Sequence, residues 1–360
     1  MYFQLGVKES REDFFNFERE LEAFDRELRC RETRMIVIKG VRRTGKSSLL
    51  RVGLAEADVP SLLLDARALG AFSPDQIFNL VASSLSKLLE KHGAFKKFLE
   101  KVRGIKITGL EVEFATGNRQ TLLEIFERLS EWGESEDQPV VLALDEAQEF
   151  RLVPKFDALL AHLYDYCRGI KLVLAGSEIG VLDRFLGRKR AGAPLFGRPC
   201  FEITMGRLPK EKAKEFLRIG FEQLGVKVKE EEISEAVEVF DGIIGWLTSY
   251  GYLASKLGHK EALFRNLEEG IKLVKEELNT FLVQRQQART RYLYILKLLS
   301  SPMTWSEVKR GLEAKLGRTI SDKQLSHYLA ELMDYSLVNR TEDKYTLADS
   351  MLARAVLEMR

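Results

Sequence analysis

The strongest chemical signal in the sequence is the glycine-rich segment Gly40-Val-Arg-Arg-Thr-Gly-Lys-Ser47. It follows an apolar run over 35–39 and precedes a helix-forming stretch, which is the context of a G-x-x-x-x-G-K-[ST] phosphate-binding loop. The glycines let successive backbone N–H groups point at phosphate oxygens, and the following helix adds its positive N-terminal end. Lys46 can reach the β- and γ-phosphates, and the Ser47 hydroxyl can ligate Mg²⁺. The sequence therefore predicts a nucleoside triphosphate site made by Gly40, Val41, Arg42, Arg43, Thr44, Gly45, Lys46, Ser47 and Ser48.

Two adjacent carboxylates, Asp145 and Glu146, follow a second apolar run over 140–144. A continuous apolar run is typical of a parallel strand buried on both faces, and α/β sheets bind ligands at the carboxyl ends of such strands. Asp145 is therefore placed to hold Mg²⁺, and Glu146 could orient and deprotonate an attacking water. The alternative is that the pair only caps the following helix.

Two further polar residues are candidates for the same site. Ser177 follows the predicted strand 171–175, so its hydroxyl could contact the γ-phosphate or the water, or could cap the next helix. Arg198 closes the basic loop 187–198 before a predicted strand at 200–203. It is a candidate to contact a triphosphate bound by its own chain or by a neighbouring one, and a solvated basic loop is the open alternative.

Composition limits the classes of protein that need to be considered. A chain of 360 residues is long enough for two or three domains, and a net charge of +2 predicts no global attraction to nucleic acid.

The cysteines and histidines bear on redox state and metal binding. Three scattered cysteines indicate reduced thiols, and the spacing of the four histidines does not suit zinc. No signal peptide or membrane-spanning run is evident, which favours the cytoplasm. The richness in Lys, Glu and Arg, with six asparagines, is typical of a thermophile. Residues 2–4 resemble a protease-site remnant, so we exclude them from the predicted fold.

Periodicity and capping signals divide the chain into three predicted domains. The first is an α/β domain over 1–206, the second a helical lid over 207–286 and the third a winged helix over 287–360. In the α/β domain we expect a β-hairpin near 104–114 as a surface insertion. The other predicted elements of this domain are helices at about 17–30, 45–56, 74–91 and 121–132, and strands at 35–39, 61–65, 140–144, 171–175 and 200–203.

The predicted winged helix has the wrong charge on its third helix for reading DNA. That helix, over 321–335, carries three acidic residues, Asp322, Glu331 and Asp334, and one lysine. Arg340 and Lys344 of the hairpin are better candidates for phosphate contacts. DNA binding, docking of a protein partner and a purely structural role all remain open at this point.

These motifs together resemble those of the archaeal AAA-like ATPases. That group is classed with the STAND signalling NTPases and is more distantly similar to archaeal origin-recognition initiators. The resemblance covers nearly the whole chain, and its most specific pieces are Gly40–Leu50, Leu144–Gln148, Pro194–Arg198 and Asp241–Leu247. It implies an AAA+-like fold in which ATP and Mg²⁺ are the cofactors, Lys46 and Ser47 hold phosphate and metal, and Asp145 and Glu146 hold metal and water. It also implies that Ser177 occupies a sensor position and that Arg198 is the arginine of the Gly-Arg motif.

Two departures from the family pattern concern the contacts around the nucleotide. Phe17 stands where the N-terminal motif of the family usually has arginine, and the lid segment Gly242-Ile-Ile-Gly245 lacks the usual proline.

The resemblance implies a slow ATP-hydrolysing molecular switch that couples nucleotide state to a winged helix. The alternative is a nucleotide-gated DNA-binding initiator or regulator in which hydrolysis is secondary. Partners through residues 287–360 and self-association remain open.

Overall fold

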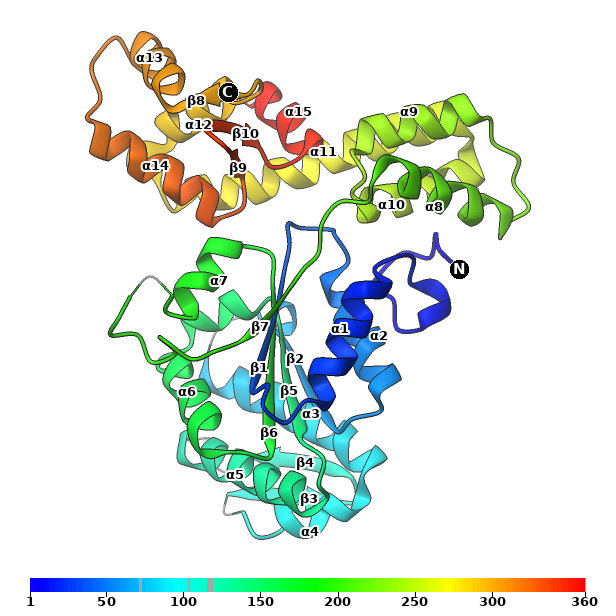
Figure 1. Cartoon of the computed structure of the whole chain (residues 1–360), viewed down its shortest axis with the longest axis vertical. Helices are drawn as coiled ribbons and strands as arrows, with labels where there is room; N and C mark the ends of the chain where they lie inside the picture. The colour runs from blue at the N-terminus through cyan, green and yellow to red at the C-terminus, as the bar shows by residue number, and fades with distance from the viewer. Residues whose placement is uncertain (71–72, 103, 115–118, 189, 360) are drawn as a thin grey trace.

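A five-stranded parallel sheet forms the base of the molecule in the computed structural model, which describes residues 1–70, 73–102, 104–114, 119–188 and 190–359 (Figure 1). The strand order is β2-β5-β6-β1-β7, and every neighbouring pair is parallel. All carboxyl ends therefore meet at one edge, and the predicted fold class is confirmed. The strands are β1 (Met35–Lys39), β2 (Ser61–Asp65), β5 (Val140–Asp145), β6 (Ile170–Gly176) and β7 (Phe201–Thr204).

Alternation along the central strands sends side chains into two separate apolar cores. Ile36 and Ile38 of β1 face the core under α1 and α2, whereas Met35 and Val37 face the core on the opposite side. The helices that accompany the sheet are α1 (Glu18–Arg29), α2 (Lys46–Ala57), α3 (Pro74–Lys91), α5 (Arg119–Ser135), α6 (Phe156–Tyr166) and α7 (Ile179–Phe185).

The predicted hairpin is present as an antiparallel pair of short strands. β3 (Ile105–Thr108) pairs with β4 (Glu111–Phe114), and the short helix α4 (Lys96–Leu99) precedes them. The Phe114 ring contacts the Phe78 ring of α3. The hairpin therefore packs on the α/β core at the end of the molecule away from the lid (Figure 1).

Four helices above the sheet form the lid, and the longest of them connects it to the C-terminal module (Figure 1). They are α8 (Lys210–Glu222), α9 (Glu230–Phe240), α10 (Ile244–Leu257) and α11 (His259–Val283). The C-terminal module consists of α12 (Arg289–Leu298), β8 (Met303–Thr304), α13 (Trp305–Leu316), α14 (Asp322–Asp334), β9 (Val338–Thr341), β10 (Lys344–Leu347) and α15 (Ser350–Glu358). Its strands form a sheet in the order β8-β10-β9, which confirms the winged helix. Strand β8 and helix α15 were not predicted.

The N-terminal residues belong to the fold, so their exclusion on sequence grounds was wrong. Phe3 is only 4% exposed and its ring contacts Phe216 and Phe221 of α8. A Cβ atom at Gly220 or Gly251 would lie within 2.4 Å of the Phe3 ring, so these glycines provide its space. The contact joins residues more than 200 positions apart, which a local motif cannot reveal. Among the described residues, no helix is both long and apolar enough to cross a membrane.

Candidate nucleotide site

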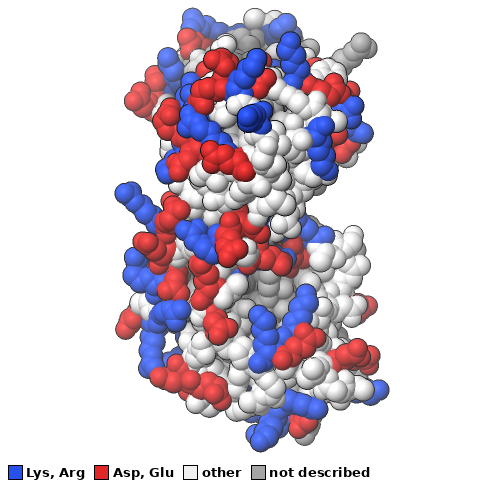
Figure 2. Space-filling model, turned by 90° about the vertical axis from the view of Figure 1, so that its right-hand side faces the viewer, with Lys and Arg blue, Asp and Glu red and all other residues white. Residues whose placement is uncertain are grey.

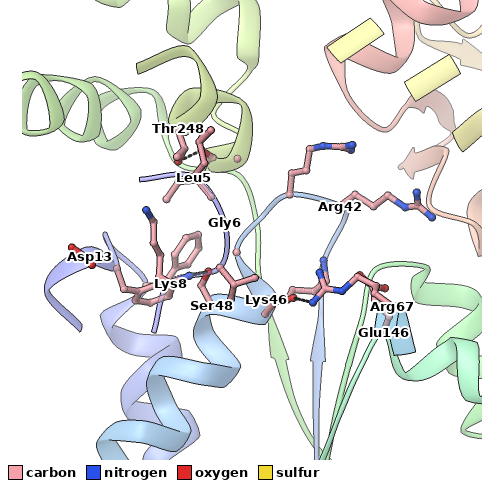
Figure 3. A pocket seen from close by; sticks show the side chains of 18 of the residues that line it. Leu5, Gly6, Lys8, Asp13, Arg42, Lys46, Ser48, Arg67, Glu146 and Thr248 are labelled. Carbon is pink, nitrogen blue, oxygen red and sulfur yellow. Dashed lines mark hydrogen bonds between the residues drawn. The ribbon is translucent and has the colours of Figure 1, made fainter. Parts of the chain in front are cut away.

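A cavity of about 530 Å³ lies at the carboxyl edge of the sheet, between the phosphate loop, the N-terminal segment and the lid. Its volume is in the range of small-molecule sites, which is roughly 300–1,000 Å³. Figure 3 shows Leu5, Gly6 and Lys8 on one side, Thr248 of the lid above, and Arg67 and Glu146 on the opposite side of Lys46. The cavity therefore has a polar end at the strand termini and an apolar end near the N-terminal segment.

The segment between β1 and α2 has the backbone shape of a phosphate loop. Gly45 adopts a positive φ of +96°, and a Cβ atom at Gly40 would lie 2.3 Å from the carbonyl oxygen of Met205. Helix α2 begins at Lys46, so its N-terminal amides face the cavity. The Lys46 ammonium donates a hydrogen bond to the Val41 carbonyl at 2.7 Å, and burial lowers the pKa of Lys46 to about 8.

The structure brings Ser177 and Glu146 together. One carboxylate oxygen of Glu146 accepts hydrogen bonds from the Ser177 hydroxyl and from the Gln148 amide, both at 2.7 Å. Burial raises the pKa of Glu146, but the Lys46 ammonium and these two hydrogen bonds outweigh it, so the net pKa is lowered. Glu146 is therefore an ionised base in a fixed orientation.

Neither capping alternative is supported. The N-cap of α7 is Glu178, which makes no side-chain cap hydrogen bond, so Ser177 does not cap that helix. The residues after Glu146 form a short 3₁₀ helix over Ala147–Leu152, and Glu146 caps it with no side-chain hydrogen bond.

Ser47 and Asp145 lie close together, because one Arg67 nitrogen contacts both of them. Asp145 is 2% exposed, and its burial raises the pKa of its carboxyl group, while the nearby Ser47 hydroxyl lowers it. No cluster of three or more His, Cys, Asp or Glu residues suited to a metal occurs within the described part of the chain. This donor set fits Mg²⁺, which usually takes one or two protein oxygens and completes its shell with phosphate oxygens and water.

The apolar end of the cavity is lined by aromatic and aliphatic side chains. Phe14 and Phe17 line it together with Ile244 of the lid. The Lys8 amide donates to the Ser48 hydroxyl at 3.0 Å, which fixes the N-terminal segment to the first turn of α2. Phe17, the residue that replaces the family arginine, therefore contributes an apolar wall and no charge.

The lid contacts the phosphate loop directly. The Gly245 amide donates to the Arg43 carbonyl at 3.0 Å, and the Arg43 guanidinium lies over the Trp246 ring at 4.2 Å from its centre. Glu277 of α11 forms ion pairs with Arg42 at 3.1 Å and with Arg43 at 2.9 Å. The two arginines of the loop thus bind the lid.

Arg198 is not brought to the phosphate loop of its own chain. It immediately precedes β7, which runs parallel to β1, so it lies at the amino edge of the sheet, whereas the loop lies at the carboxyl edge. Its guanidinium pairs with Asp165 at the end of α6. A contact with a nucleotide of a neighbouring chain stays a prediction. Lys189, another basic residue of this loop, lies outside the described residues.

Three residues of the site were missed from the sequence: Gln148, Arg67 and Glu277. Gln148 follows Glu146 by two positions and could have been noticed for that reason. Arg67 and Glu277 could not, because their partners depend on the strand order and on how the lid docks.

The fold and site define a phosphate-loop ATPase with a helical lid and a winged helix. Residues 14–249 match the model of an ATPase domain found predominantly in Archaea, and residues 286–348 match the C-terminal winged helix-turn-helix domain of MCM proteins. The chain belongs to this archaeal ATPase family.

Solved structures show the same architecture. A Walker-type ATPase of Pyrococcus abyssi is 30% identical, with a TM-score of 0.84 over 99% of this chain and 100% of that one. The ORC2 protein of Aeropyrum pernix, in ADPNP–ADP complexes, is 16% identical, with a TM-score of 0.58 over 98% of each chain. A comparison with curated proteins returned no match.

Proposed function

We propose that the protein binds ATP with Mg²⁺ and hydrolyses it slowly, and that nucleotide state controls the position of the winged helix. The proposal of hydrolysis depends on Glu146, which lies beside the phosphate loop. Its carboxylate is ionised and accepts two hydrogen bonds. Release of free phosphate without a phosphorylated acceptor would distinguish this hydrolysis from the reaction of a small-molecule kinase.

Each residue has a distinct task in this proposal. The loop amides and Lys46 bind the β- and γ-phosphates, and the pocket of Phe14 and Phe17 takes the base. Ser47 and Asp145 would hold Mg²⁺, which would neutralise charge that develops on the phosphates. Glu146 accepts the proton of the attacking water, while Ser177 and Gln148 keep its carboxylate in place.

The coupling to the winged helix runs through α7, which begins two residues after Ser177. The Ile179 amide donates to the Ser336 hydroxyl at 3.0 Å, and Arg184 pairs with Asp334 at 2.6 Å. A rearrangement at Ser177 on loss of the γ-phosphate would therefore act on the contact between α7 and α14. Such a polar contact between two packed elements suits a two-state change in orientation.

Comparison of the wild type with Glu146→Gln tests the hydrolytic role. We expect the variant to bind ATP and to lose turnover by about 10²–10⁴-fold, which is the usual contribution of a general base. Glu149→Gln is the matched control, because Glu149 also lines the cavity and pairs with Arg151. Equal turnover in wild type and Glu146→Gln would remove the catalytic role, and absence of ATP binding in the wild type would remove the whole proposal.

The partner of the winged helix is better explained as a protein than as DNA. The acidic residues of α14 are held in ion pairs, Asp322 with Lys309, Glu331 with Arg285 and Asp334 with Arg184. The exposed tip of the wing, residues 339–344, carries two basic and two acidic side chains. Acidic and basic side chains are also interspersed on the face shown in Figure 2, which is the side of the molecule away from the winged helix. Salt-sensitive duplex binding that is lost on substitution of Arg340 and Lys344 would overturn this preference.

A further inference from the structure

Arg67 occupies the position between the two residues that would hold the metal. It follows β2 directly, and β2 lies next to β5 with Asp65 in register with Asp145. One terminal nitrogen of Arg67 donates to Asp145 at 2.5 Å and to the Ser47 hydroxyl at 3.4 Å. A single positive group thus contacts both of the oxygen donors that a divalent cation would use.

Asp65 holds this guanidinium in place from the other side. Its two carboxylate oxygens accept from the Arg67 Nε at 2.9 Å and from the same terminal nitrogen at 2.8 Å. The Arg67 amide also donates to Asp65 at 3.0 Å, so backbone and side chain are both fixed. Arg67 itself lines the cavity and is 47% exposed, so it has room to move.

The electrostatics explain why a cation is needed there. Asp145 is almost fully buried, and a buried carboxylate without a positive partner is strongly unfavourable. The Oδ2 atom of Asp145 accepts from Arg67, and its Oδ1 atom accepts from the Glu146 amide at 3.1 Å, so both oxygens already have a donor. Direct ligation of a metal through Oδ2 would bring a second positive group to the oxygen that Arg67 contacts, so the metal and Arg67 compete for it.

We propose that Arg67 is a counter-ion that takes the place of Mg²⁺ and competes with it for Asp145. In the metal-free protein Arg67 neutralises Asp145. When Mg²⁺ arrives with the nucleotide, Asp145 and Ser47 pass to the metal and Arg67 stays near the site on Asp65 alone. Arg67 is thus a positioning residue that sets the Mg²⁺ concentration at which nucleotide is held. The inference rests on the proposed binding of a magnesium nucleotide.

The test measures binding, so it does not depend on turnover. A fluorescent N-methylanthraniloyl derivative of ADP is titrated with Mg²⁺ in wild type, Arg67→Gln and Arg67→Lys. Gln keeps hydrogen bonding but removes the charge, and we expect the Mg²⁺ concentration for half-maximal binding to fall by about ten- to a hundredfold, the factor expected from losing one charged hydrogen bond. Lys keeps the positive charge but lacks the planar guanidinium that donates two hydrogen bonds to Asp65. The Mg²⁺ concentration for half-maximal binding should therefore shift less in Arg67→Lys than in Arg67→Gln.

Arg218→Gln is the matched control for these variants. Arg218 is clamped by both oxygens of Glu230 in the same fork geometry and is 44% exposed, but it lies in the lid and does not line the cavity. It should leave the Mg²⁺ requirement unchanged.

A second readout covers the case in which Arg67→Gln folds poorly. In metal-free buffer this variant should unfold at a lower temperature than wild type, and Mg²⁺ with ADP should restore more stability to it than to wild type.

An unchanged or higher Mg²⁺ requirement in Arg67→Gln would overturn the inference while leaving the proposed function intact. Failure of the wild type to bind the nucleotide at any Mg²⁺ concentration would instead overturn the proposed function.

Discussion

Replacing Gly180 by alanine should separate the winged helix from α7 without disturbing either fold. A Cβ atom at Gly180 would lie 2.1 Å from the Oδ1 atom of Asp334 and 2.4 Å from its Cα atom. The second of these is backbone, so no side-chain rotation relieves the overlap and α14 must move away. Alanine is a better helix former than glycine, so α7 itself should gain about 0.5–1 kcal/mol.

The expected magnitude follows from the contacts that the overlap would break. Overpacking of this kind costs about 1–3 kcal/mol. The hydrogen bond between Ile179 and Ser336 contributes about 1 kcal/mol, and the ion pair of Arg184 with Asp334 contributes less because Arg184 is half exposed. The docked orientation should therefore lose about 1–3 kcal/mol, which changes the ratio of docked to undocked molecules by roughly five- to a hundredfold.

Hydrogen exchange followed by mass spectrometry measures this effect locally. Peptides that cover α7 and the turn after α14 should exchange faster in Gly180→Ala, whereas those that cover α5 should not change. Gly93→Ala is the control, because a Cβ atom at Gly93 would have no neighbour within 4 Å. Unchanged exchange at α7, or faster exchange throughout the α/β domain, would refute the reasoning.

Three further perturbations test other contacts. Phe3→Ala should lower the free energy of unfolding by about 3–5 kcal/mol in a denaturant titration, because the ring fills a space that the lid glycines leave for it. Glu277→Gln removes the carboxylate that joins Arg42 and Arg43 to the lid, so bound nucleotide should dissociate several-fold faster in a stopped-flow chase. Burial lowers the pKa of Lys171 from 10.5 to about 8, so the folded state binds fewer protons than the unfolded state between these values and stability should rise with pH there. Burial also lowers the pKa of Lys8 and of Lys46 to about 8, so Lys171→Met should reduce that rise in thermal unfolding midpoints between pH 8 and pH 10.5 and leave the share of the other two lysines.

Local sequence patterns were sufficient for the parts of the site that are contiguous in the chain. The phosphate loop and the Asp145–Glu146 pair each join a strand end to its own loop, so residue type and spacing determine their position. Ser177 could be placed for the same reason, because it follows a strand of the same parallel sheet. The lid segment without the family proline contacts the loop through its backbone, by the hydrogen bond from the Gly245 amide to the Arg43 carbonyl.

The remaining parts of the site depend on topology. Arg67 meets Asp145 only because β2 is the neighbour of β5, which the chain order does not show. The parallel direction of β7 places Arg198 at the opposite edge of the sheet from the loop of its own chain, so only the predicted contact with a neighbouring chain's triphosphate stays open. Phe3 was left out of the predicted fold because residues 2–4 match a short sequence pattern. Its surroundings in the structure are formed by helices far along the chain.

The apolar core on the α1 and α2 side of the sheet has a mechanical consequence. It continues without a break through the lid into the winged helix, including Phe281, Tyr292 and Leu352. The contact of α7 with α14 and the turn after it, in contrast, includes the hydrogen bond from Ile179 to Ser336, the ion pair of Arg184 with Asp334 and a close approach at Gly180. Polar contacts exchange readily with water, while a continuous core is lost only by unfolding. Release of α7 should therefore leave the winged helix attached to the lid through this shared core and α11, so that the lid and the winged helix respond as one unit.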